Sequence, residues 1–320
     1  MTSGTGTHSC GPERALHSSS QQAFRRFVEL LYLNGSIIPV GQAHISPFDR
    51  GFLYGDGLFE TIRIYDGKGY LLGRHLRRLA SGLDYLGIGH PSERELEEAV
   101  QLTVAANGVG DAVLRLMVTR GTGGSVGEPG ESEAPTVLIT LKPLLHKTDN
   151  NLPGGGEAII TLSALHVEPA LGRRLKMLNY LTAIYSAREL REAGVREGVL
   201  LTRDGIIAEG TVSTIFCIAR GALFTPPLEL GILPGITRER LLELAWEAGV
   251  QVREERFGRA FLLDADECFY TNSVRELVPV VRVDDRVIGA GEPGELTRRL
   301  AELYRADIRR TVARRQTGTL

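Results

Sequence analysis

The chain has 320 residues, 42% of them hydrophobic and 24% charged, with a formal net charge of −2, so one to three domains with an ordinary hydrophobic core are expected. Its arginines are interleaved with acidic residues, which argues against a nucleic-acid-binding protein, and no apolar run approaches the roughly 18 residues of a membrane span. Cys10, Cys217 and Cys268 are too far apart for disulfide or zinc spacing and favour a reducing compartment, so we expect a cytoplasmic protein without a metal site.

The first 30 residues are predicted to form a disordered or weakly ordered extension. Residues 1–21 are small, polar and without hydrophobic periodicity, a composition that cannot bury enough apolar surface to fold. A transit peptide is the alternative interpretation of this stretch. The segment FRRFVELL that follows could form a short helix.

Residues 31–145 are predicted to form a small α+β domain. Two hairpins come first, at 31–40 around Asn34-Gly35 and at 58–72 around Asp66-Gly67, because these dipeptides favour tight turns. The elements expected next are a helix at 74–86, a helix at 92–108, a strand at 112–120 and a strand at 136–142. Ser92 and Glu95 have the spacing of a capping box at the start of the second helix, and Gly108 marks its end.

Residues 157–310 are predicted to form a larger domain, joined to the first by a polar, glycine-rich linker at 146–156. Its expected elements are a strand at 157–165, a helix at 179–193, short strands within 198–227, a helix at 236–250, strands within 267–283 and a helix at 293–308. Residues 311–320 are expected to be a tail. Strands with helices on their outside place the chain in the α+β or α/β class.

Several common catalytic motifs are missing from the sequence. No G-x-G-x-x-G follows a strand, and the glycine-rich segment 121–130 matches neither this motif nor a P-loop. There is no H-E-x-x-H and no G-x-S-x-G. These absences argue against P-loop nucleotide binding, zinc-dependent hydrolysis and serine hydrolysis.

Lys176 is the most informative single residue. The chain has only four lysines, and Lys176 lies between Leu175 and Met177 at the start of an apolar-periodic segment. Placing an ammonium group among apolar neighbours is costly, and desolvation favours the neutral, nucleophilic amine. Such a lysine typically forms a Schiff base, with a substrate carbonyl or with pyridoxal phosphate. The alternative is a surface lysine whose stem packs on apolar neighbours.

Three other positions could complete a pyridoxal-phosphate site. Ile236 and Thr237 follow a Pro-Gly turn and open a helix, so their backbone N–H groups are a potential phosphate site. Arg78 could add a charge-assisted hydrogen bond to the phosphate. Glu209, after an apolar strand, could keep a pyridine nitrogen protonated. Viewed separately, an exposed turn acid is the more common interpretation of Glu209, and an ordinary helix start is the more common interpretation of residues 233–238.

Six segments, taken in order, resemble the class IV (fold-type IV) family of pyridoxal-phosphate enzymes. They are SPFDRGFLYGDGLFETIRIYDG (46–67), RHLRRL (74–79), LKMLNYL (175–181), GIIAEGTVSTIF (205–216), FTPPLELGILPGITR (224–238) and TNSVRELVPV (271–280). The family includes branched-chain and D-amino-acid aminotransferases, (R)-selective amine transaminases and aminodeoxychorismate lyases. The resemblance implies two domains with the cofactor between them, and a homodimer.

The resemblance also implies roles for individual residues. Lys176 matches the Schiff-base lysine that moves a proton between substrate and cofactor, and Glu209 matches the acid at the pyridine nitrogen. Phosphate contacts are implied for Arg78, for the backbone amides of Ile236 and Thr237, and for Ser273. The residues that it places at the substrate pocket are Tyr54, Arg120 and Tyr180.

The reaction itself is predicted to be amino-group transfer between an amino acid and a 2-keto acid. The alternative is 4-amino-4-deoxychorismate lyase, because GDGLFET and TNSVRELVPV also resemble lyases, but the Arg-Gly common after their R-G-T-G-G motif is Ser125-Val126 here. A third possibility is an inactive relative that acts as a binding protein. Preference for D- or L-substrates stays open, and Arg63, Arg115 and Arg120 are all possible partners of the substrate carboxylate.

Overall fold

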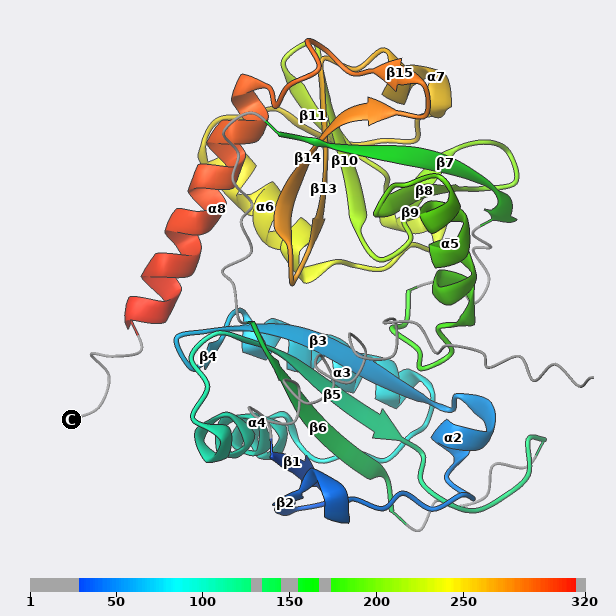
Figure 1. Ribbon diagram of the computed structural model, residues 1–320, viewed down its shortest axis with the longest axis vertical. Coiled ribbons are helices and arrows are strands. Elements are labelled where there is room, and N and C mark those ends of the chain that lie inside the picture. Colours follow the sequence, from blue (N-terminus) through cyan, green and yellow to red (C-terminus); the bar gives the residue numbers. More distant parts are fainter. Residues whose placement is uncertain (1–28, 128–133, 145–154, 167–173, 315–320) are drawn as a thin grey trace, which may run out of the picture.

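The computed structural model describes residues 29–127, 134–144, 155–166 and 174–314. Within them the chain forms two lobes, each built on one β-sheet, and Figure 1 shows the lobes one above the other. We call the lobe made by residues 30–143 the first lobe and the lobe made by residues 157–314 the second lobe. The predicted extension up to residue 28, most of the predicted linker and residues 315–320 lie outside the described residues.

The first lobe contains a six-stranded sheet in the order β2-β1-β6-β5-β3-β4. The strands are β1 (Leu30–Leu33), β2 (Ser36–Pro39), β3 (Gly57–Tyr65), β4 (Lys68–Gly69), β5 (Ala112–Thr119) and β6 (Thr136–Pro143), and all neighbouring strands are antiparallel. Both predicted hairpins are confirmed, with Asn34-Gly35 and Asp66-Gly67 at positive φ in their turns.

Two long helices, α3 (Leu72–Tyr85) and α4 (Glu93–Asn107), pack on this sheet, and a short helix α2 (Arg50–Tyr54) precedes β3. The predicted capping box at Ser92 and Glu95 is confirmed, and so is the helix end at Gly108, which is left-handed. Leucines of α3 and α4 meet the apolar face of β3 and β5 in one core. This core fixes the position of β3, which forms one wall of the cavity described below.

The second lobe contains a nine-stranded sheet in the order β12-β11-β10-β13-β14-β7-β8-β9, with β15 paired to β14. The strands are β7 (Glu157–His166), β8 (Glu197–Leu201), β9 (Ile207–Gly210), β10 (Thr214–Ala219), β11 (Ala222–Thr225), β12 (Val252–Glu254), β13 (Glu267–Asn272), β14 (Glu276–Val283) and β15 (Arg286–Val287). The pairs β11/β12, β14/β7 and β7/β8 are parallel, so the sheet is mixed.

Four helices surround the second sheet: α5 (Leu181–Glu192), α6 (Ile236–Glu247), α7 (Arg259–Leu263) and α8 (Glu295–Arg314). The sequence predicted three of them, but it missed α7 and placed the end of α8 at residue 308 instead of Arg314. Within the described residues, no helix combines the length and apolar character needed to cross a membrane. An α+β chain with two sheets agrees with the predicted fold class.

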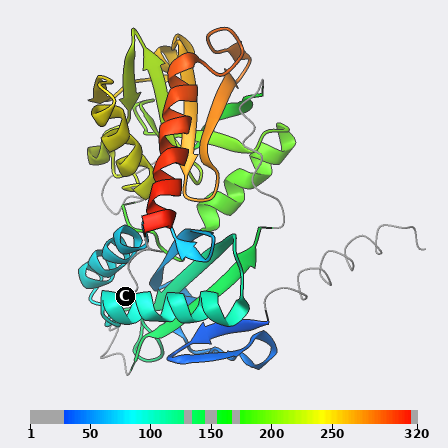
Figure 2. The same cartoon turned by 90° about the vertical axis from the view of Figure 1, so that its left-hand side faces the viewer.

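Helix α8 joins the lobes along one side of the molecule, where Figure 2 shows it extending toward the first lobe. Tyr70, which lies between β4 and α3 of the first lobe, is buried in the second lobe's core and donates to the Asp307 carboxylate over 2.7 Å. Tyr65 donates to Glu276 over 3.0 Å, and the Lys68 ammonium donates to the Val312 carbonyl over 2.6 Å. These contacts fix the two sheets relative to each other.

Replacing Leu83 by alanine should lower the free energy of unfolding by about 3 kcal/mol, because its side chain is completely buried between α3 and the first sheet. Leu102 on α4 is 56% exposed, so Leu102→Ala is the matched control and should change stability by less than about 0.5 kcal/mol. Urea unfolding followed by circular dichroism measures both. Equal losses in the two variants would contradict the assignment of the core.

Candidate active site

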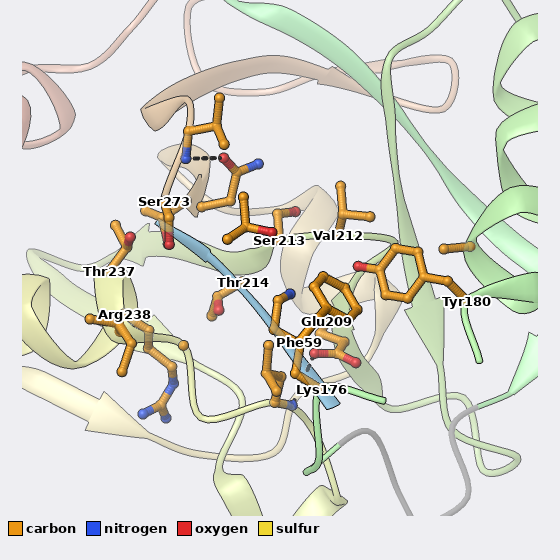
Figure 3. Close-up of a pocket in the computed structure, with 18 of the residues that line it drawn as sticks. Phe59, Lys176, Tyr180, Glu209, Val212, Ser213, Thr214, Thr237, Arg238 and Ser273 are labelled. Carbon is orange, nitrogen blue, oxygen red and sulfur yellow. Dashed lines mark hydrogen bonds between the residues drawn. The ribbon is translucent and has the colours of Figure 1, made fainter. Parts of the chain in front are cut away.

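A cavity of about 640 Å³ lies between the two lobes and is lined by residues of both. The first lobe contributes Phe59, Thr61, Arg78 and Arg115, and the second lobe contributes Lys176, Tyr180, Glu209, the turn 212–214 and the segments 235–238 and 271–275. In Figure 3, Tyr180 and Thr237 lie at opposite ends of the labelled residues, with Lys176 and Glu209 between them. The cavity therefore collects side chains that are far apart in sequence.

The backbone around Lys176 is held against the open edge of β3. Strand β4 pairs only with the end of β3, at Ile64 and Tyr65, so the edge at residues 57–59 is available to another segment. There the Phe59 amide donates to the Lys176 carbonyl over 2.9 Å, and the Leu178 amide donates to the Gly57 carbonyl over 3.0 Å. A Cβ atom at Gly57 would lie 2.4 Å from the Val118 carbonyl of β5 and 2.9 Å from the Leu178 side chain, so only glycine fits between β5 and this segment.

The side chain of Lys176 is half-buried and lies among aromatic rings. Its Nζ atom is 4.6 Å from the centroid of the Phe59 ring and 5.8 Å from that of Tyr180. The two rings meet edge to face at 5.2 Å, so they form a continuous aromatic wall beside the amine. An amine against such a wall has fewer water contacts than a surface lysine.

Glu209 occupies a buried position at the end of β9. Its side chain is 4% exposed, and its Oε2 atom accepts a hydrogen bond from the Leu233 amide over 3.1 Å. The carboxylate is thereby fixed at the wall of the cavity, next to the segment that leads into α6. A buried carboxylate in this place can bind a cationic ring nitrogen.

The start of α6 presents backbone donors to the cavity. Gly235 is the N-cap residue and offers no side chain, so the amides of Ile236 and Thr237 have no side-chain cap. Thr237 is buried, and the Tyr304 hydroxyl lies 3.4 Å from its Oγ1 atom. Ser273 lies in the turn after β13, which Asn272 holds by accepting from the amides of Val274 and Arg275. This end of the cavity suits an anion.

Arg78 belongs to a charged cluster that reaches from the core of the first lobe to the second lobe. Its Nε and Nη2 atoms donate to the two oxygens of Glu60 over 2.8 and 2.7 Å, and its Nη1 atom donates to the Pro234 carbonyl over 2.6 Å. The Nδ1 atom of His75 lies 2.7 Å from Glu60 Oε2. Burial alone would raise the pKa of Glu60, but Arg78 and His75 lower it to about 2. Glu60 is therefore a carboxylate at neutral pH.

Arg115 is the one of the three candidate carboxylate-binding arginines that lines the cavity. Its guanidinium carbon lies 4.1 Å from the Phe59 ring centroid. In the described part of the chain no carboxylate forms an ion pair with it. Arg63 instead lies 3.7 Å from an Asp111 oxygen, outside the cavity lining.

Tyr54 and Arg120, which the sequence assigned to the substrate pocket, are not among the residues that line the cavity. Arg120 donates to Asp56 over 2.9 Å and to the carbonyls of Leu86 and Gly87. Tyr54 is 47% exposed on α2. A substrate role for either residue stays a prediction, whereas Tyr180 does line the cavity.

The sequence analysis missed several residues of the site. Phe59 and Glu60 are adjacent in a strand, so their side chains must point to opposite faces of the sheet. The sequence pattern alone does not show that one of these faces lines a cavity between two lobes. Ser213 and Thr271 also line it, and their buried hydroxyl oxygens have no hydrogen-bond partner among the described residues. Buried hydroxyls of this kind normally have a partner, so they point to a polar ligand.

Comparison with known proteins agrees with this geometry. Residues 57–283 match the family model described as amino-transferase class IV. The chain is 39% identical over 284 residues, 87% of its length and 96% of the relative's, to a protein of Methanocaldococcus jannaschii named "Putative branched-chain-amino-acid aminotransferase". It is 35% identical over 286 residues, 88% of its length and 96% of the relative's, to the aminodeoxychorismate lyase of Bacillus subtilis.

A solved structure is similar over most of the chain. The branched-chain amino acid aminotransferase of Escherichia coli superposes with a TM-score of 0.80 and 28% identity, covering 86% of this chain and 92% of that one. The similarity extends over both lobes, so the predicted fold-type IV architecture is confirmed.

Proposed function

The chain belongs to the class IV aminotransferase family, and we propose that it moves an amino group between an amino acid and a 2-keto acid, with Lys176 as the residue that holds pyridoxal phosphate covalently. The observation that carries this proposal is the arrangement in one cavity of an amine, a buried carboxylate and the N-terminus of α6. An inactive relative would have no need to keep all three together.

The residues of the cavity fit pyridoxal phosphate. The amides of Ile236 and Thr237, the Arg78 guanidinium and Ser273 would hold the phosphate, and Glu209 would face the ring nitrogen. The buried hydroxyls of Ser213 and Thr271 are two further polar groups that would form hydrogen bonds with a bound ligand. When bound, the cofactor supplies an electrophilic carbonyl carbon and a ring that takes up the electron pair released at the substrate α-carbon.

The chain's own residues then have distinct tasks. Lys176, which comes from the backbone segment held on β3, would take the proton from the substrate α-carbon and return it at the neighbouring cofactor carbon. Glu209, fixed by the Leu233 amide, would keep a proton on the ring nitrogen. The aromatic wall of Phe59 and Tyr180 would limit the access of water to the amine.

Arg115 supports an acid as the substrate. It brings a positive charge from the first lobe into the cavity, against the Phe59 ring that the Lys176 amine also contacts. A guanidinium binds a carboxylate with two parallel hydrogen bonds, which would orient an amino or keto acid. We therefore assign the substrate carboxylate to Arg115 rather than to Arg63 or Arg120.

A second reaction is supported by one comparison. The 35% identity to the aminodeoxychorismate lyase of Bacillus subtilis makes that activity the alternative for the same cavity and the same lysine. The predicted homodimer and cytoplasmic location stay predictions from sequence. For the dimer, the exposed apolar side chains of Phe48, Phe52 and Leu53 on and beside α2 offer a surface that a second subunit could cover.

Lys176→Ala should abolish covalent attachment of pyridoxal phosphate, because Lys176 is the lysine among the described residues that line the cavity. Treatment with borohydride, denaturation and peptide mass spectrometry should find the cofactor on the peptide with Lys176 in the wild type and nowhere in the variant. Lys68→Ala is the control, since the Lys68 ammonium contacts the Val312 carbonyl away from the cavity. Trapping of the cofactor at another residue in Lys176→Ala would contradict the assignment.

Arg115→Leu should raise the KM for 2-oxoglutarate by about tenfold to a hundredfold, the loss expected for a hydrogen-bonded charge pair. The dissociation constant of the cofactor should not change, because Arg115 does not belong to the phosphate end of the cavity. Steady-state kinetics with Arg282→Leu, an exposed arginine of β14, provides the control. An unchanged KM would exclude Arg115 as the carboxylate partner.

One assay separates the two reactions. The purified enzyme is incubated with D- or L-amino acids and 2-oxoglutarate, and separately with aminodeoxychorismate. An aminotransferase produces glutamate in the first reaction and little pyruvate in the second. Rapid release of pyruvate from aminodeoxychorismate without amino transfer would establish the lyase instead.

A further inference from the structure

Glu60 is a charged residue in a place where an apolar one is expected. Along β3, alternate residues face opposite sides of the sheet, so Glu60 shares its side with Leu58, Ile62 and Ile64 in the first core. Its side chain is only 1% exposed. A buried carboxylate costs free energy unless it is paired, so its presence in this core calls for a specific partner.

Arg78 is that partner, and its hydrogen bonds with Glu60 fix the guanidinium group. Two parallel hydrogen bonds, from Nε to Oε1 and from Nη2 to Oε2, define both the position and the plane of the guanidinium group. The remaining nitrogen, Nη1, crosses to the second lobe and donates to the Pro234 carbonyl. Pro234 lies two residues before the first residue of α6. The guanidinium therefore stands at the phosphate end of the cavity in one orientation.

His75 completes the environment of Glu60 without competing for Arg78. It lies three residues before Arg78 on α3, so both side chains project from the same face of the helix. The His75 ring is 2% exposed, and burial lowers its pKa. Because Glu60 is ionised and can only accept, Nδ1 of His75 carries the hydrogen and donates it to Oε2.

We propose that Glu60 is a positioning residue that orients Arg78 for recognition of the cofactor phosphate, an inference that rests on the proposed function. The alternative is that the Glu60–Arg78 pair only stabilises the first lobe. Two observations favour positioning: Arg78 lines the cavity, and its third contact reaches the segment that leads into α6. A purely stabilising pair would need neither contact.

The test compares two ligands that differ only in the phosphate group. Binding of pyridoxal phosphate and of pyridoxal to the cofactor-free enzyme is measured by absorbance titration. Glu60→Gln should weaken pyridoxal phosphate binding by about tenfold to a hundredfold, because the amide loses the charge and one acceptor of the bidentate pair. Binding of pyridoxal should change by less than about twofold.

Asp307→Asn is the matched control. Asp307 is also a buried carboxylate with a bidentate arginine, Arg240, and a third donor, the Tyr70 hydroxyl, but it does not line the cavity. Its substitution should leave the preference for pyridoxal phosphate over pyridoxal unchanged. Equal weakening of both ligands by Glu60→Gln, or no weakening of either, would overturn the positioning role. A wild-type enzyme that does not distinguish the ligands would contradict the proposed phosphate site itself.

A double-mutant cycle shows whether Glu60 acts through Arg78. Arg78→Lys keeps the charge but cannot make two parallel hydrogen bonds, so it should also weaken pyridoxal phosphate binding selectively. In the Arg78→Lys background, Glu60→Gln should have little further effect on binding. Additive losses would refute the proposal. If Glu60→Gln does not fold, Glu60→Asp replaces it, because the shorter carboxylate cannot reach both nitrogens; unchanged phosphate selectivity in this variant would also refute the proposal.

Discussion

Two backbone hydrogen bonds fix the position of the candidate active site. They connect residues 176–178, from the second lobe, to the open edge of β3 at residues 57–59, in the first lobe. Because they involve main-chain atoms, they fix the segment itself and leave the Lys176 side chain available to the cavity. Phe59, whose amide forms one of them, also supplies the ring beside the amine. The site therefore exists only when both lobes are folded and in contact.

The side chains of β3 point alternately to the two faces of the sheet, and the two faces have different surroundings. Phe59 and Thr61 face the cavity, whereas Glu60 points into the core, where it accepts two hydrogen bonds from Arg78. A strand that forms one wall of a binding site can therefore also carry side chains on its opposite face that orient residues of that site. The same strand thus carries residues that line the cavity and a residue that fixes the guanidinium group of another lining residue.

The sequence predicted the parts of this site that depend on local patterns. A lysine among apolar residues, a Pro-Gly turn before a helix and an acid after a strand are all visible over a few neighbouring positions, and a family resemblance linked them. The sequence did not show that Arg115 lines the cavity and Arg120 does not, because this depends on the contacts of Arg120 with Asp56 and with two carbonyls of the α3–α4 connection. The pairing of Glu60 with Arg78 also depends on packing between a strand and a helix.

The contacts between the two lobes along α8 have a consequence for how the protein unfolds. Tyr70 of the first lobe is buried among residues of α6, α8 and the second sheet, and Asp307 holds its hydroxyl. Separating the lobes would expose this aromatic surface to water, so neither lobe can lose its structure without weakening the other. Melting should therefore be one cooperative transition, and a ligand bound in the cavity should protect both halves of the chain from proteolysis.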